Sequence, residues 1–408
     1  MIIIYNLILI LFFIITFPGS YFILLYYLKK TKYEFPNKKY FYWIHCASLG
    51  EVKIALRLID NISLRTKISK EKILLTITNP KTKMIAKKQH NDVYIFPIDF
   101  FLITRKFLNI VNPKVLLIIE TDLWPNYIYF SKKIGTKIFL LNGRMSRRTL
   151  ILLKMFKVLF NVGLSNIDYI TVREEIDLRR FAKIYPKNRI MITGNMKYDD
   201  IENFNFDFKK ENLRFNKNDF ILTFGSIRDG EESFVLETIN NLQNKNIKFI
   251  IAPRHLKNIQ KIAEMLNKDK IKFVKRTELV HSKDNGEDVE CILVDTLGEL
   301  KKFYFISDII FVGGTILPYG GQSIIEPASL GKVVIFGPYI ENFFEISKLL
   351  KKHNACYSIK TVGELVDIVL SLQKDEYKRN IIGNNAKEVV EKLKGATQKN
   401  VDFVLNNL

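Results

Sequence analysis

Short apolar runs alternate with amphipathic stretches through most of this 408-residue chain, and this alternation limits the fold more than any other feature. Strands that alternate with helices build a parallel sheet covered by helices on both faces. A first series of predicted strands covers Tyr42–Ile44, Ile73–Ile77, Tyr94–Phe96, Val115–Ile119, Ile138–Leu141 and Tyr169–Val172. A second series covers Phe220–Phe224, Phe249–Ile251, Cys291–Val294, Ile309–Val312 and Val333–Phe336.

Two such series predict an α/β protein with two Rossmann-like domains. We expect the first domain over residues 29–197 and the second over 219–385, joined by a polar linker over 198–218 that is rich in Asp, Asn, Lys and Phe. The last stretch, 386–408, is predicted to be helical. In doubly wound domains ligands bind at the carboxyl ends of the strands, so a site in a cleft between the domains is expected.

Residues 1–28 carry no charged side chain and exceed the roughly 20 apolar residues that a spanning helix needs. Pro18 and Gly19 should kink or break this helix, so the segment either spans with a kink or dips into the interface. Lys29, Lys30 and Lys32 follow, and the positive-inside tendency places the downstream chain in the cytoplasm. A cleaved signal peptide is the alternative, disfavoured because no basic residue precedes the apolar core. We expect an uncleaved N-terminal membrane anchor helix.

The net charge of +21 comes from 63 Lys and Arg against 42 Asp and Glu. This excess is typical of proteins that bind nucleic acid, an anionic membrane surface or a phosphorylated substrate. A genome-wide bias towards Lys, Ile and Asn explains much of the charge equally well. The 3 Cys residues form no CxxC pair, which argues against a zinc site or a disulfide framework.

The first predicted strand runs into a tight turn at Gly50, and Glu51 then falls in the first turn of the next helix. A carboxylate there lies near the positive end of the helix dipole. From these residues alone, stabilisation of the helix N-terminus is favoured over a catalytic role.

Two acidic residues, Glu120 and Asp122, follow the buried strand Val115–Ile119. Carboxylates this close in sequence perturb each other's pKa when they are partly buried. The structural alternative is a helix start, with Asp122 or Thr121 as the cap and Pro125 in the first turn. Both interpretations can hold together.

Basic side chains follow other strand ends of the first half. Arg144, Arg147 and Arg148 come after a glycine turn, where an anion site and a solvated helix start are equally good interpretations. Lys197 lies in the segment that closes the first half, and we expect it to face the cleft.

Glycine pairs and anion-binding side chains mark the strand ends of the second half. Arg254 and His255 follow one strand, and glycine pairs stand at 313–314 and 320–321. Paired glycines let backbone N–H groups approach a phosphate, and a helix N-terminus completes such a site. Glu326 lies one turn further on, where carboxylates commonly bind ribose hydroxyls. The sequence has no P-loop motif, HExxH or Asp-x-Asp cluster, so neither a P-loop hydrolase nor a metal site is predicted.

Taken together, these segments resemble the bacterial Kdo (3-deoxy-D-manno-octulosonic acid) transferase family, which has the glycosyltransferase B fold. The resemblance covers residues 42 to about 345 in order, together with the N-terminal anchor segment. The matching segments are HCASLGEV, TITNPKT, FPID, ETDLWPN, NGRMS, GNMKYD, APRH, DTLGEL, FVGGT, GGQSIIEPA and FGPYIENF.

The resemblance implies an inverting glycosyltransferase that moves Kdo from CMP-Kdo to the lipid A precursor lipid IVA, without a metal or other cofactor. Glu51 matches the family's catalytic base, which takes the proton from the attacking acceptor hydroxyl. Glu120 and Lys197 match positions assigned to transition-state stabilisation, and Lys197 would neutralise the departing phosphate. How a carboxylate at position 120 would help is not evident from the sequence.

The resemblance also implies a CMP-binding set in the second half, in which Arg254 contacts phosphate and Glu326 the ribose. The set comprises Pro253, Arg254, Leu297, Gly298, Glu299, Ser323, Ile324, Ile325 and Glu326. The family usually has Asn-Pro where this chain has Ser323-Ile324, which puts one contact to the nucleotide in question.

Lipid IVA is a bisphosphorylated glycolipid, so the resemblance implies a bacterial inner (cytoplasmic) membrane location with the catalytic domains on the cytoplasmic side. A basic, anchored first domain suits the anionic lipid surface. Candidate contacts for the acceptor phosphates are Arg144, Arg147, Arg148, Lys81 and Lys83. In this fold the C-terminal stretch 386–408 crosses back onto the first domain.

Two alternatives stay open. One is another membrane-associated sugar-nucleotide transferase, or an epimerase, of the same fold; an epimerase needs no lipid acceptor, so an essential membrane segment argues against it. The other is a basic membrane-bound protein that binds nucleic acid with a steep salt dependence and tolerates loss of Glu51. The aromatic residues lie in strands and core-like runs, not among the basic residues as stacking platforms, so no nucleic-acid partner is expected.

Overall fold

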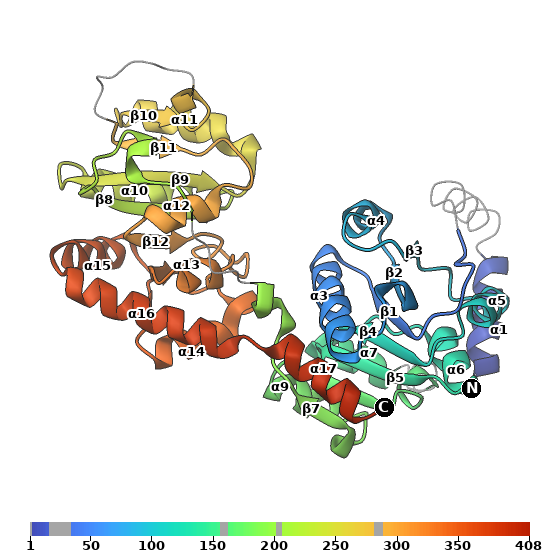
Figure 1. Ribbon diagram of the computed structural model, residues 1–408. Helices are drawn as coiled ribbons and strands as arrows, with labels where there is room; N and C mark the ends of the chain where they lie inside the picture. The colour runs from blue at the N-terminus through green and yellow to red at the C-terminus, as the bar shows by residue number, and fades with distance from the viewer. Residues whose placement is uncertain (1, 16–33, 156–161, 201–205, 281–288) are drawn as a thin grey trace. The chain divides into compact units, whose positions relative to one another are not determined.

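The described part of the chain forms two seven-stranded sheets, and every strand pair in them is parallel (Figure 1). The computed structural model describes residues 2–15, 34–155, 162–200, 206–280 and 289–408. It divides into unit 1, which comprises Met1–Asp200 and Leu393–Leu408, and unit 2, which comprises Ile201–Lys392. The prediction of two parallel-sheet α/β domains is confirmed.

The sheet of unit 1 has the strand order β3-β2-β1-β4-β5-β6-β7, so the direction of winding reverses between β1 and β4. The carboxyl ends of strands beside such a reversal bound the usual ligand crevice. The strands are β1 (Tyr42–Cys46), β2 (Ile73–Ile77), β3 (Val93–Ile95), β4 (Val115–Ile119), β5 (Lys137–Gly143), β6 (Tyr169–Val172) and β7 (Ile190–Ile192).

Two hydrophobic cores cover the two faces of this sheet, because successive strand side chains point to opposite faces. Tyr42 and Ile44 belong to the core shared with α3 (Leu49–Thr66) and α17 (Ala396–Asn406). Trp43 belongs to the other core, with residues of α5, α6 and α7. The C-terminal helix α17 thus packs beside α3 within unit 1 (Figure 1). Further helices of this unit include α4 (Pro80–Lys87), α5 (Phe101–Val111), α6 (Pro125–Lys133), α7 (Arg147–Met155), α9 (Glu175–Phe181) and the short 3-10 helix η3 (Met196–Asp200).

The apolar helix α1 (Ile2–Ile15) packs against α6 of unit 1. Its two polar side chains face this unit: the Tyr5 hydroxyl donates to Asp99 at 2.9 Å, and Asn6 and Asn126 exchange amide hydrogen bonds of 2.8 and 3.0 Å. Among the described residues, no helix has the length and apolar character needed to cross a membrane. Residues 16–28 of the predicted anchor lie outside the described part of the chain.

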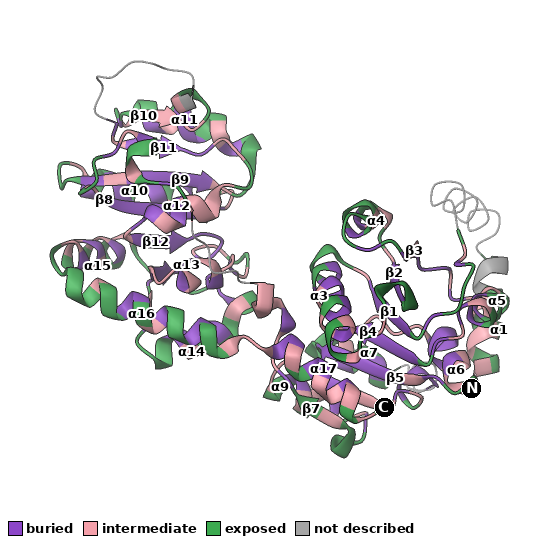
Figure 2. Cartoon of the chain, in the orientation of Figure 1, coloured by how far each residue is buried: buried purple, intermediate pink, exposed green. Residues whose placement is uncertain are grey.

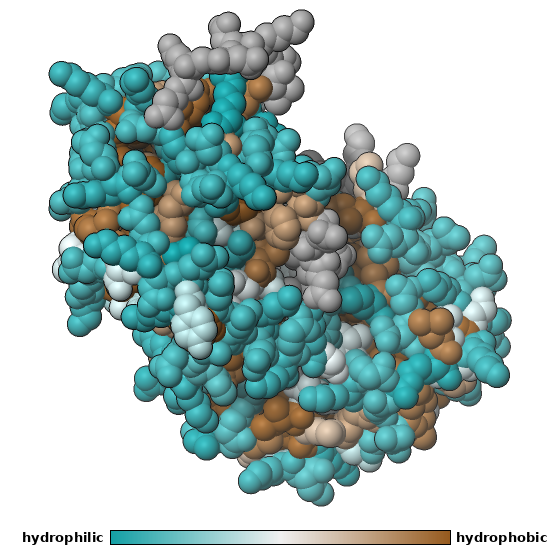
Figure 3. All heavy atoms as spheres, turned by 60° about the vertical axis from the view of Figure 1, so that its left-hand side comes forward, coloured by the Kyte–Doolittle hydropathy of each residue, from teal (hydrophilic) through white to brown (hydrophobic). Residues whose placement is uncertain are grey.

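The sheet of unit 2 has the order β10-β11-β9-β8-β12-β13-β14, and its winding reverses between β8 and β12. The strands are β8 (Phe220–Ile227), β9 (Ile247–Pro253), β10 (Phe273–Lys275), β11 (Cys291–Leu293), β12 (Ile309–Val312), β13 (Val333–Phe336) and β14 (Cys356–Ser358). The helices are α10 (Glu232–Leu242), α11 (Ile259–Lys268), α12 (Leu300–Ile306), α13 (Ile325–Ser329), α14 (Phe344–Lys352), α15 (Val362–Lys374) and α16 (Glu376–Leu393). Buried residues concentrate in the strands of both sheets (Figure 2), and hydrophilic side chains cover most of the face drawn in Figure 3.

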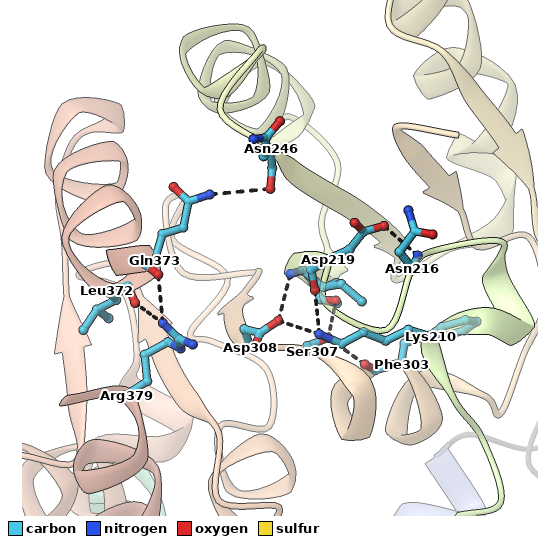
Figure 4. Close-up of polar contacts among 12 residues, drawn as sticks. Lys210, Asn216, Asp219, Asn246, Phe303, Ser307, Asp308, Leu372, Gln373 and Arg379 are labelled. Carbon is cyan, nitrogen blue, oxygen red and sulfur yellow. Dashed lines mark hydrogen bonds and ion pairs between the residues drawn. The ribbon is translucent and has the colours of Figure 1, made fainter. Parts of the chain in front are cut away.

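The predicted linker over 198–218 is too long. Phe208, Leu213 and Phe215 are buried in a core of unit 2. Lys210 donates to the Asp219 carbonyl at 2.6 Å and pairs with Asp308 at 3.1 Å, which ties this segment to the sheet (Figure 4). Residues 206–218 therefore belong to unit 2, because their aromatic side chains complete its core. The predicted final element also differs: residues 386–393 still belong to α16, and the last helix begins at Ala396.

A matched pair of glycines tests the packing of unit 2. An added Cβ at Gly383 in α16 would lie 2.0 Å from the backbone oxygen of Gly331, so Gly383→Ala should lower the free energy of unfolding by about 1–3 kcal/mol. Gly363 in α15 has only the Thr361 hydroxyl, at 4.0 Å, so Gly363→Ala should raise it by up to about 1 kcal/mol. Urea unfolding measures both; a Gly383→Ala variant as stable as wild type would contradict the close approach.

Candidate active site

Glu51 stands at the carboxyl end of β1, in the first turn of α3, and is 7% exposed. Its carboxylate accepts the Ala47 backbone N–H at 2.7 Å and the Ser48 hydroxyl at 2.6 Å, on different oxygens. Ser48 is the N-cap and accepts the Glu51 N–H at 3.3 Å. The helix-stabilising interpretation of Glu51 is thus supported, and each carboxylate oxygen keeps acceptor capacity for a substrate hydroxyl.

Glu120 and Lys197 form an ion pair of 2.5 Å between Lys197 Nζ and Glu120 Oε1. Glu120 follows β4 in a left-handed conformation, φ 62°, with its N–H bonded to the Leu141 carbonyl. A non-glycine residue in this conformation costs about 1–3 kcal/mol and is frequent at functional sites. Lys197 comes from η3, and its side chain passes Gly50: the Lys197 Cε lies 3.6 Å from where a Gly50 Cβ would be.

The structure therefore gathers the three predicted catalytic residues at the carboxyl ends of β1 and β4. Glu120 contacts Lys197, and Lys197 lies over the residue that precedes Glu51. This geometry offers an explanation for the carboxylate at position 120, because it pairs with the Lys197 ammonium and orients it. The chemical roles of the three residues stay predictions.

The sequence did not predict a pair beside these residues, formed by the buried His45 and the partly buried Asp122. His45 in β1 bonds Thr76 through Nδ1 and Asp122 through Nε2, both at 2.9 Å, and the Thr78 hydroxyl donates to the same Asp122 oxygen at 3.1 Å. Burial raises the pKa of Asp122, but the interactions with His45, Trp124 and Thr78 outweigh burial and hold the pKa below its ordinary value. The expected cap role of Asp122 or Thr121 is wrong, because α6 begins at Pro125 with Trp124 at its N-cap and no side-chain cap bond. The segment HCASLGEV includes His45, but the sequence did not predict this pairing, since Thr76 lies on β2 and Asp122 in the loop after β4.

The basic residues predicted to contact the acceptor lie mostly on the surface. Arg144 and Lys81 are exposed, and Lys83 pairs with Glu34 at 3.5 Å. Arg147 and Arg148 are exposed in the first turn of α7, whose exposed apolar residues are Ile151, Leu152 and Met155. This helix thus presents both cationic and apolar side chains to its surroundings.

The predicted nucleotide-binding residues of unit 2 follow the carboxyl ends of β9, β11 and β12, at one edge of the sheet. Arg254 is exposed and Leu297 is 76% exposed, while Gly298 has φ 86°. Ile324 and Ile325 are buried, so only their backbone can reach a ligand. Pro253 and Ser323 are partly exposed at the same edge.

The two predicted carboxylates of this set differ in their surroundings. Glu299 accepts the Thr296 hydroxyl at 2.6 Å and pairs with Arg276 at 3.3 Å. Burial raises the pKa of Glu299, but these two partners outweigh burial and lower it overall. Glu326 lies in the first turn of α13, partly exposed, and its charge contributes to a raised pKa of the buried Tyr304.

Glu231, at the N-cap of α10, binds the glycine-rich loop that was predicted to bind a phosphate. Its fully buried carboxylate accepts backbone N–H groups of Arg228, Gly314, Thr315 and Ile316 at 3.0, 2.6, 2.9 and 2.9 Å. The expectation that the N–H groups at 313–314 bind phosphate is therefore wrong for Gly314, whose N–H is already taken. Glu231 instead joins the loops after β8 and β12, on either side of the winding reversal.

Solved structures share this architecture. A glycosyltransferase from Rickettsia africae matches with a TM-score of 0.59 at 14% identity, over 90% of this chain and 98% of that one. The Anabaena HepE protein in complex with UDP matches with a TM-score of 0.55 at 12% identity, over 91% of this chain and all of that one. The chain therefore has the two-sheet fold of the B-type glycosyltransferases.

Sequence comparisons identify the family. The family model described as 3-deoxy-D-manno-octulosonic-acid transferase matches residues 26–200. A 3-deoxy-D-manno-octulosonic acid transferase of Haemophilus influenzae is 30% identical over 371 residues, which are 89% of this chain and 86% of that protein. A bifunctional glycosyltransferase/methyltransferase of Fusobacterium nucleatum is 32% identical over 85% of this chain, which spans only 55% of its length. The chain belongs to the Kdo transferase family, and it is a transferase enzyme.

The His45–Asp122 pair predicts a pH-dependent contribution to stability. Because folding lowers the Asp122 pKa, the carboxylate's contribution is complete above the unfolded pKa of about 3.9 and is lost as pH falls through the folded pKa. Asp122→Asn should thus lower the free energy of unfolding by about 1–3 kcal/mol at pH 7 and pH 5, and the difference should shrink below about pH 4. Urea titrations at these pH values measure it. Asp60→Asn, at an exposed ion pair with Lys70, is the control and should change stability by less than about 1 kcal/mol.

Glu231→Gln tests the loop-joining carboxylate. A carboxamide has one acceptor oxygen and would turn an NH₂ group towards backbone N–H donors, so unfolding should become easier by about 3 kcal/mol. Calorimetry with CMP should also show weaker binding, because the loops after β8 and β12 lose their shared anchor. Glu237→Gln, at an exposed position of the same helix, should match wild type in both measurements; equal behaviour of the two variants would refute the assignment.

Proposed function

We propose that this family member transfers Kdo from CMP-Kdo to lipid IVA by an inverting, metal-independent displacement. The observation that supports this best is the grouping of Glu51, Glu120 and Lys197 at the carboxyl ends of β1 and β4. The relative of Haemophilus influenzae is named for Kdo transfer, and lipopolysaccharide biosynthesis is the setting that such transfer implies.

Glu51 acts as the general base in this proposal. An acceptor hydroxyl donates its proton to a Glu51 carboxylate oxygen while the hydroxyl oxygen attacks the anomeric carbon of Kdo, and the bond to the phosphate oxygen of CMP breaks. The Ala47 N–H and the Ser48 hydroxyl hold the carboxylate in place without using all of its acceptor sites. Lys197 supplies positive charge to the departing phosphate, which stabilises the transition state as charge develops there.

In this proposal, CMP binds at the carboxyl ends of the unit 2 strands. The exposed Arg254 after β9 suits the phosphate, and the partly exposed Glu326 suits the ribose hydroxyls. The exposed backbone at 297–298 offers N–H and C=O groups to the base. Without Asn-Pro at 323–324, the contact from this turn comes from the Ser323 hydroxyl and the backbone.

The acceptor side of the proposal rests on the surface of unit 1. Helix α1 exposes Ile3, Leu7 and Leu11, and α7 exposes arginines next to apolar residues. Apolar side chains with neighbouring cations suit an anionic lipid surface, with a few tenths to about 1 kcal/mol contributed by each cation. We place the enzyme at the cytoplasmic side of the bacterial inner membrane, where the arginines at 144, 147 and 148 and Lys81 meet the acceptor phosphates.

A transfer assay in detergent tests the proposal. Purified full-length protein receives CMP-Kdo and a tetraacylated lipid A precursor in the presence of EDTA, and products are read by mass. Wild type should add Kdo stepwise, and Glu51→Gln, which keeps the shape of the helix cap, should be slower by about 10²–10⁴-fold. Thermal unfolding of both proteins checks that the substitution does not destabilise the start of α3.

Each other outcome has a separate meaning. Equal rates for wild type and Glu51→Gln would keep the reaction and refute the base. Transfer that requires an added metal ion would refute metal independence. A folded wild type that binds CMP but transfers nothing would refute this donor–acceptor pair and favour another sugar-nucleotide transferase of the same fold.

A further inference from the structure

Lys197 lies close to the point where the chain leaves unit 1. The chain passes into unit 2 after Asp200 and returns to unit 1 at Leu393. Lys197 belongs to η3 (Met196–Asp200), which is the last element before the first crossing, and α17 begins just after the second. The side chain of Asp199 joins η3, just before the first crossing, to the start of α17, just after the second.

The Asp199 carboxylate caps α17 from a distant part of the sequence. It accepts the backbone N–H groups of Gly395, Ala396 and Thr397 at 2.7, 3.3 and 2.5 Å. Gly395, the N-cap of α17, supplies no side-chain cap of its own. A carboxylate at a helix N-terminus satisfies unpaired N–H groups and complements the helix dipole.

Helix α17 is itself fixed to the sheet, so it provides Asp199 with a firm attachment. Asn400 is buried, donates to the Thr193 hydroxyl at 2.9 Å and accepts the Thr171 hydroxyl at 2.5 Å. Val401 and Val404 belong to the core that α17 shares with α3. The bonds to Asp199 are therefore not what keeps α17 on unit 1.

The other end of η3 is held by the sheet and by α3. The Met196 N–H donates to the Asn142 side-chain oxygen at 3.0 Å, and the Met196 carbonyl accepts from Arg57 at 3.0 Å. Lys197 thus lies between a support at Met196 and a support at Asp199. The other contacts of η3 after Lys197 include the bond from the Tyr198 N–H to the Asn195 carbonyl at 3.0 Å and the surface ion pairs of Asp200 with Lys53 and Arg57.

We propose that Asp199 is a positioning residue for Lys197: by joining η3 to the N-terminus of α17, it keeps the Lys197 ammonium on Glu120 and over the first turn of α3. This inference rests on the proposed function of Lys197. Asp199 touches neither Glu120 nor the reacting atoms, and it acts only through the backbone that carries Lys197.

The test reads the placement of Lys197 directly and by activity. The variants are Asp199→Asn and, as a control, Asp402→Asn, which removes an exposed ion pair of α17 with Arg65 far from η3 in sequence. In competitive acylation of the full-length protein, followed by mass spectrometry, Asp199→Asn should raise the reactivity of Lys197 several-fold, because the amine leaves its ion pair. Asp402→Asn should leave it unchanged. Unchanged Lys197 reactivity in Asp199→Asn would overturn the inference whether or not the protein transfers Kdo.

A double-mutant cycle separates positioning from general stability. Asp199→Asn should lower kcat for Kdo transfer by about 10- to 100-fold with little change in KM for CMP-Kdo, since a misplacement near 1 Å has effects of this order. In the Lys197→Ala background, Asp199→Asn should cause no further loss of kcat. Equal losses in both backgrounds would show a merely structural role and overturn the inference. Absence of transfer by wild type would instead refute the proposed function, and the acylation result would still decide the role of Asp199.

Discussion

The parallel direction of every strand is the constraint on which both candidate sites depend. In a parallel sheet all carboxyl ends open at one edge, and a reversal of winding leaves a gap there between neighbouring helices. In unit 1 this edge gathers Glu51, Glu120 and the His45–Asp122 pair from the ends of the neighbouring strands β1 and β4. In unit 2 the same geometry brings residues 253–254, 297–299 and 323–326 to one edge. A site built from several strand ends in this way needs no contiguous sequence motif, only short loops after the strands.

Carboxylates acting on backbone N–H groups organise these edges. Glu51 takes the N–H of Ala47, Glu231 takes four N–H groups of two loops, and Asp199 takes three at the start of α17. Loop N–H groups that have no partner in the protein must be satisfied by water or ligand. An internal carboxylate removes this demand and fixes the loop before any substrate arrives, which is the preorganisation that electrostatic catalysis requires.

The interior strands and the edge strand β3 were predictable, and the other edge strands were not. The strands buried on both faces read as continuous apolar runs, as in Val115–Ile119, whereas the missed strands β7, β10 and β14 are three-residue edges whose side chains are half-buried or exposed. Left-handed conformations at Glu120 and Ser226 were equally hidden, because nothing local marks Glu or Ser for φ near 60°. Resemblance to a family located the three residues of the unit 1 site, but it did not explain why Glu120 stands among them. Partners such as Asn400 and Thr171, 229 positions apart, come together only through the return of α17.

The pairing of Glu120 with Lys197 has a further consequence for the site. A lone ammonium in a partly enclosed pocket pays a desolvation cost without compensation, and a lone carboxylate would repel an anionic substrate. The pair avoids both costs in the free enzyme, with Glu120 16% and Lys197 40% exposed. A phosphate that enters finds an ammonium that is already ordered and still accessible, and the ammonium can share its three donors between the carboxylate and the phosphate. The carboxylate thus holds the cation in place, so under the proposed function the negative charge at Glu120 would serve a reaction whose leaving group is itself negative.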